Sequence, residues 1–202
     1  QVVGYDPQHD KSDRAVRISK HMTYQLKTRM EEWEDDNDRM MHALPIIGSM
    51  FKKTHYCPVR ERCVSDLVYA RDLVFDFYAK NLENATRKTH MIYLTPNEIE
   101  ERIRAGLFLD LDLQGEGTRP ERPLAFEHEG LTQTYREDDD PRLFLEQHRL
   151  LDLDDDGLAE PYCVTVDHDT KQVFRIVPRY ESEDIERTDR MIRRFNPIEY
   201  FT

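Results

Sequence analysis

The spacing of apolar residues changes along this chain, and that change constrains the fold more than any other feature of the sequence. Up to about residue 44, apolar residues recur at intervals of three and four, which places them on one face of a helix. Beyond residue 46, apolar and polar residues alternate in short runs separated by turn-forming residues, a pattern typical of half-buried strands. The sequence therefore predicts an α+β fold, with an N-terminal helical hairpin followed by mostly antiparallel strands and one inserted helix.

Two helices are expected in the first part of the chain. The first spans about Ser12–Met30 and has a serine as its candidate N-cap. The second spans about Glu32–Leu44 and carries acidic residues in its first turn, where the helix dipole favours negative charge. Pro45 is expected to end the second helix because it lacks a backbone amide hydrogen. The first predicted domain is thus a helical hairpin over residues 1–45.

The rest of the chain, residues 46–202, is predicted to form a mixed α/β region. The run Thr95–Glu98 combines a threonine cap, a proline at the first helical position and a glutamate three residues after the cap, so a helix should begin there and end near Gly106. Residues 107–141, rich in glycine, proline and charge, are predicted to be a long mobile loop. The predicted strand segments are Ile46–Tyr56, Val64–Phe77 (one or two strands), Thr89–Leu94, Leu143–Leu153, Tyr162–Val166 and Gln172–Tyr180, followed by helical turns over Ser182–Thr188 and an extended end.

The charge balance argues against one class of function. The chain has 29 lysine and arginine residues against 41 aspartate and glutamate residues, a net charge of -12. Proteins that hold duplex DNA by neutralising its phosphates need a basic face, so tight DNA binding by this chain is not expected. Its three cysteines form no C-x-x-C pair, which favours a reducing compartment over a disulfide framework.

One local motif predicts a metal site. Aspartates at alternate positions followed by a glycine fold their carboxylates around a hard cation such as calcium. In the segment 152–160, carboxylate ligands would come from Asp152, Asp154 and Asp156. Leu158 would offer its backbone carbonyl, and Glu160 would occupy the ninth position. The twelfth position of an EF-hand, normally glutamate, is a cysteine here, so the segment is either a calcium loop in a β-hairpin or an acidic, solvated turn.

Catalytic motifs are missing from the sequence. It contains no G-x-S-x-G, H-E-x-x-H, phosphate-binding loop or G-x-G-x-x-G pattern, so we expect the protein not to be an enzyme. Two other interpretations remain open. One is a calcium-binding interaction domain, which would show a strong stabilisation by calcium. The other is a hydrolase with paired carboxylates, which would show two acids converging in a deep pocket.

Three stretches of the chain together resemble one protein family. They are residues 33–54, with Trp33-Glu34-Asp35-Asp36 and the run from Ala43 to Thr54, residues 66–83, and residues 146–167. In this order they resemble the portal proteins of tailed double-stranded DNA bacteriophages, especially those of short-tailed phages and related prophages. The resemblance covers most of the chain, and the ordered set is more specific than any one motif.

The resemblance implies a structural role without catalysis. A portal subunit is one member of a ring, usually of twelve copies, at one vertex of the capsid, and viral DNA is packaged and ejected through that ring. The implied partners are other portal subunits, the terminase, capsid and scaffold proteins, and tail or head-completion proteins. The implied location is the virion, with assembly in the host cytoplasm and no membrane. The chain would be a fragment that corresponds to the outward-facing wing, and the channel-lining helix would follow it.

Overall fold

The computed structural model describes residues 10–82, 85–113, 140–181, 183, 185–188, 191–195 and 197–202. It confirms the predicted α+β fold class, with N-terminal helices followed by antiparallel strands and an inserted helix. The contacts divide the chain into two compact units. The first unit combines residues 1–69 with residues 200–202, and the second spans Ala70–Glu199. The predicted domain boundary at residue 45 falls inside the first unit, and most of the predicted loop 107–141 lies outside the described residues.

The first unit begins with helices. α1 (Asp10–Tyr24) continues into a π-helical turn, η1 (Gln25–Arg29), and α2 (Trp33–Ile47) follows after three residues. The prediction that Pro45 ends the second helix was wrong, because the helix runs two residues further. A proline in the last turn removes only one helical hydrogen bond, whereas Gly48 adopts a left-handed conformation (φ 87°) that turns the chain out of the helix.

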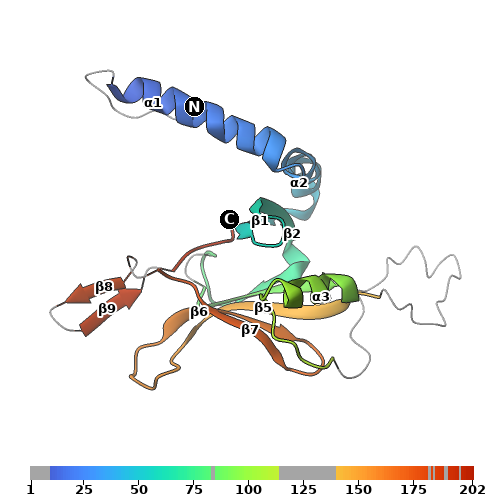
Figure 1. The fold of residues 1–202 in the computed structure, drawn as a ribbon, viewed down its shortest axis with the longest axis vertical. Helices are drawn as coiled ribbons and strands as arrows, with labels where there is room; N and C mark the ends of the chain where they lie inside the picture. Colours follow the sequence, from blue (N-terminus) through green and yellow to red (C-terminus); the bar gives the residue numbers. More distant parts are fainter. Residues whose placement is uncertain are drawn as a thin grey trace, which may run out of the picture. The chain divides into compact units, whose positions relative to one another are not determined.

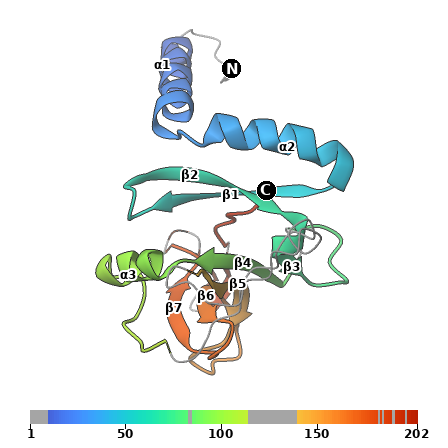
Figure 2. The same ribbon diagram turned by 90° about the vertical axis from the view of Figure 1, so that its right-hand side faces the viewer.

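α2 packs on a two-stranded ribbon, as Figure 2 shows. The ribbon consists of β1 (Met50–Cys57) and β2 (Arg62–Tyr69), which pair antiparallel along their whole length. Val64 and Val68 of β2 are nearly completely buried. Two polar contacts tie the helix to the ribbon. The Lys52 ammonium donates to the Asn37 side-chain oxygen at 2.7 Å, and the Leu67 amide donates to a carboxylate oxygen of Asp36 at 3.2 Å.

The second unit is built on a five-stranded antiparallel sheet in the order β3-β4-β5-β6-β7 (Figure 1). A short 3-10 turn, η2 (Ala70–Asp72), precedes it. Each strand overlaps a strand predicted from the alternation of apolar and polar residues. Sequential neighbours pair throughout, so every connection in the sheet joins adjacent antiparallel strands. The strands are β3 (Leu73–Phe75), β4 (Arg87–Leu94), β5 (Arg142–Leu151), β6 (Glu160–Asp167) and β7 (Val173–Pro178).

Helix α3 (Pro96–Arg104) forms where the sequence predicted it. Its capping box is complete: the Thr95 hydroxyl accepts from the Glu98 amide, and the Glu98 carboxylate accepts from the Thr95 amide. The helix ends before Gly106, which has a positive φ of 70°. α3 closes an apolar core over one end of the sheet. Its buried members are Leu94, Ile99, Phe144 and Phe174.

The last pair of strands corrects another prediction. Residues 182–188 were expected to be helical, but β8 (Ile185–Thr188) pairs antiparallel with β9 (Met191–Phe195). Charged residues dominate this segment, so its local composition favours no strand. The extended conformation depends on hydrogen bonds to β9, which a local reading of the sequence does not reveal.

Candidate functional site

The predicted calcium loop lies in the second unit, between the end of β5 at Leu151 and the start of β6 at Glu160. The structure brings three of the predicted ligands together. One carboxylate oxygen from each of Asp152, Asp154 and Asp156 lies within 4.8 Å of the others, and all three side chains are exposed. The strands on either side pair directly, so the loop is the turn of a β-hairpin, as the calcium interpretation required.

Backbone amides organise this loop. The Asp152 carboxylate accepts from the amides of Asp156, at 3.3 Å, and Gly157, at 2.9 Å, and an oxygen of Asp156 accepts from the Leu158 amide at 2.7 Å. Asp155 and Gly157 both adopt positive φ angles, of 57° and 89°, so the chain turns sharply and keeps the aspartates on its inner side. These hydrogen bonds are made within the loop itself, and both a calcium loop and a solvated acidic turn can contain them.

The remaining two predicted ligands behave differently from the aspartates. A carboxylate oxygen of Glu160 accepts a hydrogen bond from the Tyr162 hydroxyl, which raises the pKa of that tyrosine. The Leu158 amide donates to Asp156 within the loop. The calcium interpretation concerns a different group of this residue, its backbone carbonyl, which would be the ligand. Desolvation by the surrounding loop and the neighbouring charge of Asp156 raise the pKa of Asp154. Crowded carboxylates of this kind gain from a cation, so calcium binding stays a prediction that the geometry permits.

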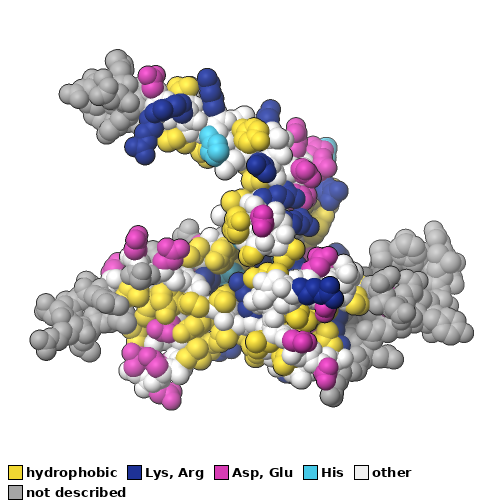
Figure 3. Space-filling model, in the orientation of Figure 1, with side chains coloured by type: hydrophobic (Ala, Val, Ile, Leu, Met, Phe, Trp, Pro, Cys, Tyr) yellow, Lys and Arg dark blue, Asp and Glu magenta, His cyan; other side chains and the backbone are white. Residues whose placement is uncertain are grey.

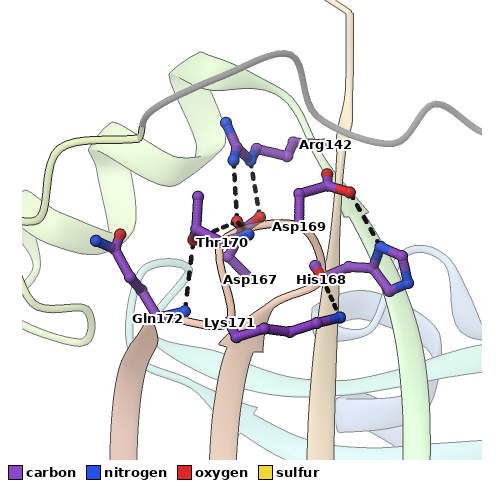
Figure 4. A network of polar contacts seen from close by, with 7 residues as sticks. All are labelled: Arg142, Asp167, His168, Asp169, Thr170, Lys171 and Gln172. Carbon is purple, nitrogen blue, oxygen red and sulfur yellow. Dashed lines mark hydrogen bonds and ion pairs between the residues drawn. The ribbon is translucent and has the colours of Figure 1, made fainter.

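A second polar cluster, not predicted from the sequence, lies at the other end of β6 (Figure 4). Arg142 donates two hydrogen bonds to Asp167, at 2.7 and 2.9 Å, in the two-pronged geometry that suits a guanidinium and a carboxylate. Thr170 donates to the same carboxylate through its amide, at 2.8 Å, and through its hydroxyl, at 2.6 Å. The Asp167 side chain is 0% exposed and that of Arg142 is 6% exposed. Burial works to raise the pKa of Asp167, but the hydrogen bonds from Arg142 and Thr170 outweigh it, and the pKa is lowered.

This cluster fixes the turn between β6 and β7. Asp167 ends β6 and begins the tight turn to β7, in which Lys171 has a positive φ of 60°. Four donated hydrogen bonds fix the turn, and Arg142 ties it to the start of β5. The sequence predicted this hairpin, but it did not indicate that Arg142, 25 residues earlier, would donate to the Asp167 carboxylate.

A third cluster lies inside the sheet. Glu146 and His148 alternate along β5, and Cys163 is the register partner of His148 on β6. Their possible ligand atoms also lie within 4.8 Å of one another, and all three residues are buried. The histidine Nε2 and a glutamate oxygen are 2.9 Å apart, a hydrogen bond that satisfies two buried polar groups. The buried ammonium of Lys88, opposite His148 on β4, pairs with Glu199, so this part of the sheet interior is polar but largely compensated.

Neither the scan against models of known protein families nor the search of curated proteins found a match for this chain. Within the described part of the chain, no helix is both long enough and apolar enough to cross a membrane.

Proposed function

We propose that this chain is part of a portal protein subunit of a tailed double-stranded DNA bacteriophage, a structural component without catalytic activity. The observation that carries the proposal is the ordered sequence resemblance over residues 33–54, 66–83 and 146–167. Three stretches that keep the same order through most of a chain are harder to explain by composition than a single motif is.

The three stretches fall on defined parts of the fold. The first covers α2 and most of β1, and the second runs from the second half of β2 through β3 into the following turn. The third covers the second part of β5, the acidic loop and β6. Each stretch therefore contains both a regular element and the turn that follows it. A resemblance that includes turns argues for a shared fold more strongly than one confined to apolar strands, because turn residues are chosen for backbone geometry.

The proposed partners follow from the role. Neighbouring portal subunits would complete a ring, usually of twelve copies, and the terminase, capsid and scaffold proteins, and tail or head-completion proteins would bind the assembled ring. DNA would pass through the channel without being held by this part of the subunit, since the net charge of -12 offers little attraction for phosphates. The subunit would act in the virion at the portal vertex, after assembly in the host cytoplasm.

Electron microscopy of the full-length protein tests the proposal directly. We expect ring-shaped particles with a central channel, and we expect this chain to fit the outer rim of the ring. Full-length protein that forms no ring under any assembly condition, or a ring whose outer rim cannot accommodate the two units described here, would refute the proposal.

A calcium-binding interaction domain unrelated to phage assembly is the second candidate. The specific observation in its favour is the convergence of Asp152, Asp154 and Asp156 on one exposed loop. The two candidates differ in their dependence on the ion. A calcium-loaded module should lose most of its stability in a chelator, whereas a portal subunit with a solvated acidic turn should keep it.

A further inference from the structure

Helix α1 exposes an apolar stripe. Ile18 and Met22 are one helical turn apart and are 42% and 47% exposed, and Leu26 of η1 continues the same face. Two basic residues, Arg14 and Arg17, flank the stripe. The helix and its π-helical turn are basic overall: residues 10–29 contain six lysine and arginine residues against two aspartates. An amphipathic helix with half-exposed apolar residues gains stability when another surface covers them.

The structure holds this helix away from one obvious partner, the α2 of its own chain. Arg62 of β2 donates from one guanidinium nitrogen to the Arg29 carbonyl, at 2.8 Å, and from the other to the Glu32 carboxylate. It therefore clamps both sides of the turn between the two helices. Met30, in the middle of this turn, is 8% exposed, and its carbonyl accepts from the Trp33 amide at 3.1 Å. Folding α1 back onto α2 in the same chain would break these contacts.

The outward surface of α2 has the complementary chemistry. Three acidic residues in the first half of α2, Glu34, Asp35 and Asp38, are exposed, whereas Asp36 of the same helix faces β2 and accepts from the Leu67 amide. Glu34, Asp38 and Met41 follow one another at intervals of four and three residues, so they share one exposed face of α2, and Met41, which is 67% exposed, makes the C-terminal part of that face apolar. Figure 3 shows basic side chains along α1 and acidic ones gathered on α2. Both helices have 15 residues, so they match in length.

We propose that α1 of one copy of this chain docks on the outward face of α2 of a second copy, with Ile18 and Met22 against Met41. The contact is head-to-tail, because it joins two different surfaces, and it leaves each copy with a free α1 or a free α2 for the next one. This inference deepens the proposed function, since it assigns the contact between neighbouring subunits, but its argument uses only the surfaces of α1 and α2.

Sedimentation velocity on the 202-residue chain, over a concentration series from micromolar to submillimolar, tests the contact. We expect the average mass of the wild-type chain to rise with concentration. The double variant Ile18→Glu/Met22→Glu should weaken self-association by about a hundredfold or more, because two apolar side chains are lost from the contact and two carboxylates are added beside acidic residues. The matched control Leu109→Glu places the same charge on an exposed apolar residue of the second unit and should leave self-association unchanged.

Charge exchange separates contacts between copies from contacts within one copy. The variants Arg14→Glu/Arg17→Glu and Glu34→Lys/Asp38→Lys should each self-associate at least about tenfold more weakly than wild type. An equal mixture of the two should recover the wild-type mass, because the reversed α1 of one variant meets the reversed α2 of the other. Circular dichroism of each variant checks that the fold is kept.

Two results would overturn this inference. One is a wild-type chain that stays monomeric up to submillimolar concentration. The other is self-association that neither the apolar variant nor charge exchange affects, or that the mixture does not recover. Either result, together with ring-shaped particles of the full-length protein, would refute α1–α2 docking and leave the portal proposal standing.

Discussion

Replacing Asp167 with asparagine should destabilise the protein more than any other single change in its polar clusters. The aspartate side chain is 0% exposed, and its two oxygens accept two hydrogen bonds from Arg142 and two from Thr170. Asp167→Asn keeps the shape but leaves the buried guanidinium without its counter-charge. Breaking a buried ion pair from one side costs about 3–5 kcal/mol. For a chain of this length that corresponds to a fall in melting temperature of roughly 10 °C.

Chemical denaturation of four proteins measures this cost. Thr170→Ala removes one hydroxyl donor and should cost about 1 kcal/mol. The double variant Arg142→Met/Asp167→Leu removes both charges together and should be closer to wild type than Asp167→Asn is, because no buried charge is left unpaired. An Asp167→Asn protein within about 0.5 kcal/mol of wild type would refute the reasoning, since that is the scale of an ordinary surface substitution.

The Arg142–Asp167 pair should also affect how the stability of the protein falls at low pH. The pKa of Asp167 is lower in the folded protein than the ordinary value of 3.8, so the folded state favours the carboxylate. Its contribution is therefore complete above pH 3.8 and is lost as the pH falls through the lower, folded-state pKa. The difference in stability between wild type and Asp167→Asn should shrink in that acidic window, and a difference that is constant down to the lowest pH would contradict the assignment.

Two further predictions concern the acidic loop and helix α3. Millimolar calcium should raise the melting temperature by about 3 °C, as expected for a weak site. Asp154→Asn should abolish this response and, in a chelator, should raise the melting temperature slightly, because the raised pKa of Asp154 shows that the folded loop disfavours its charge. A wild-type melting curve that calcium leaves unchanged would support the solvated-turn interpretation instead. For the capping box, Thr95→Ala should cost about 1 kcal/mol in urea denaturation, whereas Asn97→Ala, a change on the exposed side of the same turn, should cost clearly less. Equal costs for the two variants would mean that the cap contributes little.

Features encoded within a few consecutive residues could be predicted from the sequence. The capping box of α3 needs only the four residues Thr95–Glu98, and the turn from Asp167 to Lys171 is flanked by two clearly alternating strands. The three aspartates of the predicted calcium loop also converge because their spacing and Gly157 are local properties. In each case the physical cause, a cap, a turn or a crowded loop, acts over one or two turns of chain.

Features that depend on distant parts of the chain could not be predicted in this way. Arg142 and Asp167 meet only because β5 and β6 pair in one particular register, and nothing near either residue in the sequence indicates the other. The trio of Glu146, His148 and Cys163 has the same origin. The end of α2 was predicted wrongly at Pro45 for a related reason. The helix ends at Gly48, three residues later, because this glycine adopts a left-handed backbone conformation, which the sequence alone does not reveal.

The end of the chain returns to its beginning. Residues 200–202 lie beside β1, where Thr202 exchanges backbone hydrogen bonds with Lys52 in both directions, at 2.8 and 2.9 Å, and the Thr54 amide donates to the Tyr200 carbonyl at 2.8 Å. The first unit is therefore completed by the last residues, and the whole second unit is inserted between its two pieces. During synthesis, residues 70–199 would leave the ribosome with all their own sheet partners before the ribbon of β1 and β2 receives its final segment. The first unit can therefore be completed only after the second unit has been synthesised, because a contact across 150 residues must wait for its second half.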